Sequence, residues 1–155
     1  MILRAIRNML GITFIAVIFY FILIHLEENL IFNSVLPLAG VTINQWIEKF
    51  RHLALIGIGI AWASALFWYV SGQWMIKVNN YKEGSKRVIW ALFFLFPVLT
   101  IVVTILLLPQ AQEGSFISYF LLGLNGVLSY YLGTVGFSPS SFKYTPPLAK
   151  ILRRW

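Results

Sequence analysis

The 155-residue chain is 59% hydrophobic and only 11% charged, whereas a soluble domain carries roughly 25% charged residues, so an ordinary water-soluble globule is excluded. Cysteine is absent, which excludes disulfides, thiolate metal sites and cysteine nucleophiles. The formal net charge of +7 does not indicate direct nucleic-acid binding, because the basic residues stand in short clusters beside apolar runs, as membrane topology requires.

Long segments without any charged residue divide the chain: 8–26, 53–76, 88–112 and 114–142. Each can supply the ~20 helical residues that cross a bilayer, and in lipid a helix satisfies its own backbone hydrogen bonds. We therefore predict an all-α, polytopic membrane protein. It forms one domain over residues 1–155, with spans at about 9–26, 53–75, 88–108 and 116–137 and a tail at 138–155.

The first span follows Arg4 and Arg7, as the apolar segment of a signal peptide would. No small-x-small cleavage site follows its apolar run, so we expect the span to be retained as an anchor.

The loop after this span contains a second apolar pattern. Thr42, with Gln45 three residues later, forms a capping box for a helix. Apolar residues then recur at helical spacing: Ile43, Trp46, Ile47 and Phe50. We predict a short amphipathic helix at the outer surface, with Trp46 as an interfacial anchor.

The same region holds the side chains that most resemble those of catalytic sites: His25, Glu27, Glu28, Glu48 and His52. Glu48 and His52 are four residues apart and would share one face of a helix. A metal site would require folding to bring both sets together, and no HExxH motif occurs. We expect no catalytic, metal or cofactor site, and therefore not an enzyme.

Pro97 lies inside the third span and removes the amide that would bond the carbonyl of Phe93. We expect a bend there, with the hydroxyls of Thr100 and Thr104 donating to nearby carbonyls. A static bend that improves packing is favoured over a gating hinge.

Small side chains recur every three or four residues on one face of the second and of the fourth span, beside one amide: Gly57, Ala61, Ala65, Asn125, Gly126, Ser129, Gly133 and Gly136. Such faces let helix backbones approach closely in lipid. They are expected either to pack helices within one bundle or to form a seam between copies. The spans hold no acidic, basic or histidine side chain in their interior, which argues against a proton pump or an ion-coupled transporter.

Lysine and arginine counts predict the orientation. Ten of the twelve basic residues precede the first span, lie between the second and third spans, or follow the fourth. These regions share one side of the membrane, so both termini are predicted to be cytoplasmic. Interfacial aromatics are expected beside the inner loop: Trp74, Tyr81 and Trp90.

The tail contains Thr145-Pro146, a cap and first-turn pair for a helix. The residues after it predict an amphipathic segment that lies on the inner leaflet or docks on a protein. The residues assigned to this docking are Lys143, Lys150, Leu152, Arg153, Arg154 and Trp155.

These features favour a non-enzymatic subunit of the inner membrane that forms oligomers. Its partners would be the lipid bilayer and other subunits of a larger machine, of the secretion, conjugation or defence type. The alternative is a homo-oligomeric channel or membrane-perturbing effector, with a pore lined by Asn125, Ser129 and glycine carbonyls. An outer-face membrane enzyme that uses the histidines and glutamates is the least favoured hypothesis.

Overall fold

The computed structural model describes residues 2–27, 29, 36–37, 40–75, 83–107, 111–113, 115–139 and 145–149. Its main elements are the helices α1 (Ile2–Leu26), α2 (Ile43–Val70), α3 (Glu83–Leu107) and α4 (Ser115–Gly136). A π-helical turn, η2 (Ser71–Met75), extends α2. The four helices are long and apolar enough to cross a membrane. The prediction of a helical, multi-pass membrane protein is therefore confirmed.

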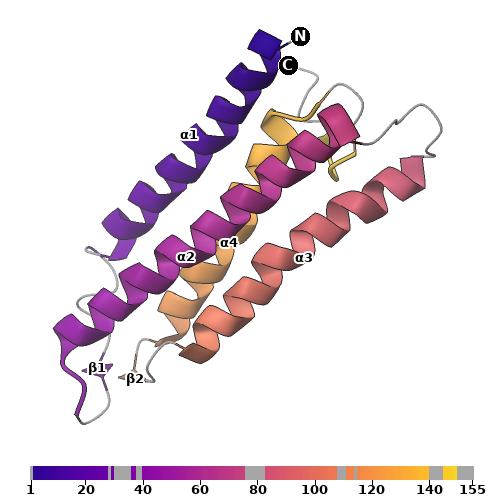
Figure 1. The fold of residues 1–155 in the computed structure, drawn as a ribbon. Helices are drawn as coiled ribbons and strands as arrows, with labels where there is room; N and C mark the ends of the chain where they lie inside the picture. Colours follow the sequence, from indigo (N-terminus) through magenta and orange to yellow (C-terminus); the bar gives the residue numbers. More distant parts are fainter. Residues whose placement is uncertain are drawn as a thin grey trace.

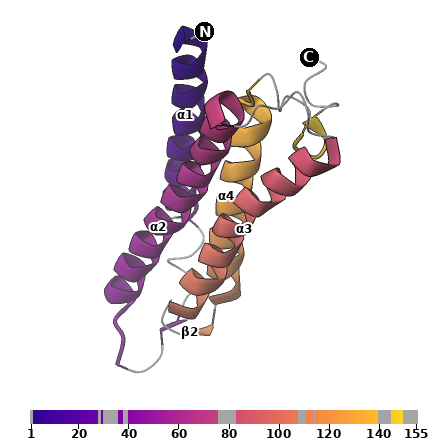
Figure 2. The ribbon, with the colours of Figure 1, turned by 45° about the vertical axis from the view of Figure 1, so that its right-hand side comes forward.

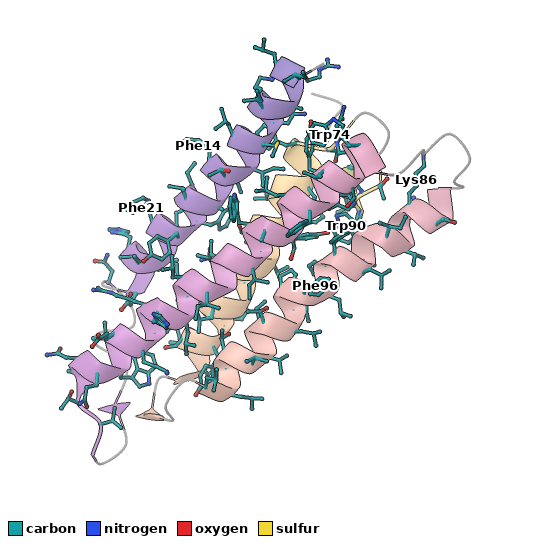
Figure 3. The ribbon with its side chains drawn as sticks, viewed as in Figure 1. Phe14, Phe21, Trp74, Lys86, Trp90 and Phe96 are labelled. Atoms are coloured by element: carbon teal, nitrogen blue, oxygen red, sulfur yellow. The ribbon has the colours of Figure 1, made fainter. Side chains whose placement is uncertain are left out.

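Consecutive helices run in opposite directions, so α2 and α4 are parallel to each other (Figure 1). These two helices form the centre of the bundle, and α1 and α3 flank them on opposite sides (Figures 1 and 2). Within the most apolar window of each helix, 44% of α2 and 39% of α4 is buried, against 17% for α1 and α3. The central helices are those that carry the small residues. On the flanking α1, Phe14 and Phe21 are each 65% exposed on the outer surface of the bundle (Figure 3).

The helices begin earlier than the hydropathy pattern predicts. Helix α1 starts at Ile2 and includes Arg4 and Arg7. The predicted outer amphipathic helix is the first part of α2, because no glycine or proline separates it from the span that follows. The predicted capping box is confirmed: the Gln45 amide donates to Thr42 Oγ1 at 3.3 Å, and the Thr42 amide donates to Gln45 Oε1 at 3.0 Å.

Trp46 is fully buried and stacks on Phe50, with ring centroids 5.6 Å apart. The prediction of an interfacial anchor is wrong for this side chain. Both rings belong to an apolar cluster that also includes Leu23 of α1 and Leu122 of α4. The apolar stripe at the start of α2 therefore faces the core of the bundle.

A short antiparallel ladder, not predicted from the sequence, joins the connection between α1 and α2 to that between α3 and α4. Strand β1 (Leu36–Pro37) pairs with β2 (Ala111–Glu113), with an irregularity in the register. We call the end of the bundle that holds these strands the β end. The opposite end holds Ile2, Gly136 and the segment 145–149 (Figure 1).

Helix α3 continues through Pro97, which is buried, and bends along its length (Figure 2). The Thr100 hydroxyl donates to the Phe96 carbonyl at 2.9 Å, and the Thr104 hydroxyl donates to the Ile101 carbonyl at 2.8 Å. The predicted hydroxyl-to-carbonyl bonds are thus present. Neither hydroxyl bonds to the Phe93 carbonyl, whose amide partner the proline removes.

Candidate functional site

The small-residue faces of α2 and α4 bring helices together within one chain. Ala61 and Ala65 are at most 1% exposed. A Cβ on Gly126 would lie 3.3 Å from Ile101 of α3, and one on Gly133 would lie 3.7 Å from Ala65. Close backbone approach of this kind favours helix association in lipid.

Two members of the predicted faces differ from the rest. A Cβ on Gly57 would meet no atom within 4 Å, so this position borders open space. Gly136 is exposed at the end of α4, and its Cβ would lie 3.8 Å from Ile15. Another close contact was not predicted: the Phe137 ring packs against the backbone of α1 at Gly11, where a Cβ would lie 2.3 Å from the ring.

An aromatic cluster occupies the end opposite the strands. Trp90 of α3 stacks on Phe94, with centroids 5.3 Å apart, and packs against Tyr130 of α4 at 5.5 Å. The Trp90 indole N–H donates to Thr134 Oγ1 at 3.0 Å, and the Tyr130 hydroxyl donates to the Trp90 carbonyl at 3.0 Å. These contacts fasten α3 to α4.

This cluster corrects one prediction about the interfacial aromatics. Trp90 is only 8% exposed and belongs to the core. Trp74 is 51% exposed, as an interfacial residue would be. Tyr81 lies outside the described residues.

The segment 145–149 folds back onto α4. Thr145, Pro146 and Ala149 are buried, and the Tyr131 hydroxyl donates to the Pro147 carbonyl at 2.5 Å. The Ala149 amide donates to the Pro146 carbonyl at 3.1 Å, which closes a turn. The helix predicted to begin at Pro146 does not form at residues 146–148, where Leu148 adopts a φ of 60°. The assigned docking residues lie outside the described part of the chain: Lys143, Lys150, Leu152, Arg153, Arg154 and Trp155.

The backbone of this turn lets us predict the effect of replacing Leu148. This leucine is 64% exposed and has a left-handed backbone conformation. That conformation costs a non-glycine residue roughly 1–2 kcal/mol. Leu148→Gly removes this strain but adds about 0.5–1 kcal/mol of chain entropy to lose on folding. We expect slower tryptic cleavage at Lys150, by up to about fivefold for 1 kcal/mol. Leu148→Ala keeps the strain and is the matched control; equal rates for the glycine and alanine variants would contradict the prediction.

At the β end, Glu27, one of the side chains that resemble those of catalytic sites, is buried and forms an ion pair. The Arg51 Nε–H donates to Glu27 Oε2 at 3.2 Å, with side-chain exposures of 40% and 0%. This ion pair joins the end of α1 to α2, and the sequence did not indicate it.

The other histidines and glutamates that resemble catalytic side chains do not join this ion pair. His25, Glu48 and His52 are exposed, and Glu28 is outside the described residues. Within the described ranges, no three His, Cys, Asp or Glu side chains are grouped closely enough to hold a metal ion.

A groove of about 270 Å³ runs between α1 and α2 on the outer surface of the bundle. Its lining is apolar and includes Ala16, Phe21 and Ile58. The Trp62 indole N–H donates to Thr13 Oγ1 across it at 3.0 Å. The indole N–H of Trp62 is therefore hydrogen-bonded within the groove.

Comparisons of the chain with protein-family models, with curated proteins and with solved structures found no match.

Proposed function

We propose that this protein is a non-enzymatic, four-span subunit of the inner membrane that anchors partners through the end opposite the strands. Charge supports the orientation. Arg4, Arg7, Lys86 and Arg87 belong to the helix ends at that side, whereas Lys49 and Arg51 belong to the β end. An excess of lysine and arginine marks the cytoplasmic side of a membrane protein. The end with the docked turn is then cytoplasmic, and the β end faces outward.

The observation that carries the docking role is the contact of residues 145–149, within the tail, with α4. Tyr131 holds Pro147, and Ala149 is buried with 0% exposure. Three of the four basic residues of the tail follow this segment, namely Lys150, Arg153 and Arg154, and Lys143 precedes it. A polybasic segment tethered in this way meets either anionic lipid or an acidic protein surface at reduced entropic cost.

Self-association is the second part of the proposal. Large apolar side chains cover the outer faces of α1 and α3, and Gly57 borders open space. Helix surfaces of this kind can contact either lipid or another transmembrane helix.

The orientation can be measured with single cysteines, because the chain has none of its own. Leu148→Cys and Asn44→Cys both place a thiol at an exposed position, at opposite ends of the bundle. We expect a membrane-impermeant maleimide added to intact cells to label Asn44→Cys only. After the cells are opened, both variants should react. Labelling of Leu148→Cys from outside would contradict the proposed topology.

The docking role predicts the result of reversing the tail charges. In a mild detergent, we expect the wild-type complex to have a mass well above the 17.8 kDa of one chain. Lys150→Glu, Arg153→Glu and Arg154→Glu together should remove its partner protein, because charge complementarity is lost. Native mass spectrometry checks both results.

The control reverses one charge at the other end with Lys49→Glu, at an exposed site outside the Glu27–Arg51 ion pair, and should retain the partner. A wild-type protein that travels as a single chain, or a reversed tail that keeps its partner, would refute the docking proposal.

The channel hypothesis receives less support from the geometry. Asn125 and Ser129 are 6% and 3% exposed within a single chain. A pore between copies would therefore require other lining residues.

A further inference from the structure

Three polar side chains form a row on the buried face of α4: Ser118, Asn125 and Ser129, which are 0%, 6% and 3% exposed. Their spacings of seven and four residues place them within about 40° of each other around the helix. Leu122, on the same face, belongs to the apolar cluster at the start of α2. The row therefore points into the bundle and not toward lipid.

Each member of this row has a hydrogen-bonding atom without a partner among the described residues. These atoms are the hydroxyl oxygens of Ser118 and Ser129 and the amide nitrogen of Asn125. A buried polar group without a partner is strongly unfavourable, and more so in a membrane. Three such groups on one face of one helix indicate that a common ligand binds them.

The threonine hydroxyls of the helices behave differently. Thr13 donates to the Met9 carbonyl at 3.0 Å, and Thr134 donates to the Tyr131 carbonyl at 3.0 Å. Thr100 and Thr104 bond within α3 in the same way. Back-bonding to the preceding turn is the usual solution for a hydroxyl in a helix. Ser118 and Ser129 do not use it, so their hydroxyls are available to another molecule.

The hydrogen-bonding groups of Ser118, Asn125 and Ser129 limit the kind of molecule that can bind them. An amide nitrogen is a donor, whereas Ca²⁺ and Mg²⁺ require oxygen ligands. No charged residue lies in 114–142 to balance an anion. The neighbouring face of α4 is close-packed, since a Cβ on Gly126 would already lie 3.3 Å from Ile101. The ligand must be small, neutral and able both to donate and to accept.

We propose that Ser118, Asn125 and Ser129 bind a file of ordered water molecules that enters the bundle from the β end. Ser118 lies in the first turn of α4 at that end, and Ser129 lies about 16 Å further along the helix. Beyond Ser129 the interior closes. Tyr130 is 0% exposed there, and Thr134 is bonded to Trp90. The file reaches past the middle of α4 and ends there.

Water access can be measured with single cysteines in the full-length chain in liposomes. Ser118→Cys and Ser129→Cys each replace a hydroxyl with a thiol of similar size. The matched controls are Ala54→Cys and Ala61→Cys, at sites on α2 that are 1% and 0% exposed. The probe is Ag⁺, and the readout is the rate at which titratable thiol disappears. A thiol needs water to ionise and react, so we expect the serine sites to react at least about tenfold faster.

Rates at the serine sites no faster than at the alanine sites would overturn the proposal. A second measurement does not depend on cysteine. In a dry interior, Asn125→Leu would remove an unpartnered amide and raise the thermal unfolding midpoint. If water satisfies the amide, the midpoint should stay the same or fall. A clear rise would therefore also overturn the proposal.

Discussion

Replacing Trp90 with alanine is expected to lower the free energy of unfolding by about 3–5 kcal/mol, as removal of a buried tryptophan usually does. Trp90 stacks on Phe94, contacts Tyr130 and Tyr131, and donates to Thr134. It lies between α3 and the central helices (Figure 3). Its loss would leave a cavity where α3 joins α4. Unfolding in mixed micelles of a mild detergent and SDS, followed by far-ultraviolet circular dichroism, measures the change.

Two variants separate packing from hydrogen bonding. Trp90→Phe retains an aromatic ring but removes the indole donor. The Thr134 hydroxyl still donates to Tyr131, so this variant should lose less than the alanine variant. Phe96→Ala, at a site that is 57% exposed on the same helix, should change stability by about 0.5 kcal/mol or less. An equal effect of Trp90→Ala and Phe96→Ala would contradict the assigned role of the cluster.

A second large effect is expected at the β end. Arg51→Met removes the partner that donates to Glu27 and leaves a carboxylate at 0% exposure. Breaking a buried ion pair from one side typically destabilises by 3–5 kcal/mol. Arg51 is 40% exposed, so solvent already screens part of the interaction. We therefore expect a loss of about 2–3 kcal/mol in the same micelle assay.

A double variant tests whether the loss comes from the stranded carboxylate. Glu27→Met combined with Arg51→Met should recover most of the stability, because apolar replacement of a whole pair is often neutral. Lys49→Met removes an exposed cation two residues away and should have little effect. If the double variant is as unstable as Arg51→Met, the ion pair is not the cause.

The spans themselves follow from the sequence because lipid imposes one simple requirement, a long uncharged helix. The four predicted spans correspond to α1, α2 with η2, α3 and α4. The capping box at Thr42 was predictable for a similar reason, since it depends on two residues three positions apart. The two central helices are also the two that carry the small-residue faces.

Features that depend on contacts between distant residues were not predictable. An apolar stripe shows that Trp46 needs an apolar environment, but it does not distinguish lipid from a protein core. Glu27 directly follows one apolar segment and Arg51 closely precedes another, and neither position indicates a partner. Their pairing across 24 positions depends on how α1 lies against α2. The same is true of Ser129, because its sequence context does not reveal whether its hydroxyl bonds to its own helix.

The central place of α4 has a consequence for synthesis in the cell. Chains are made from the N-terminus, so α4 is the last of the four spans to be synthesised. Before α4 is inserted, the small-residue face of α2 cannot pack against it. The aromatic rings of α3 likewise lack their contacts with Tyr130 and Thr134. The bundle therefore closes only when the last span is inserted. A ribosome that stalls before residue 115 would release a membrane intermediate with open helix surfaces, the kind of species that quality-control proteases remove.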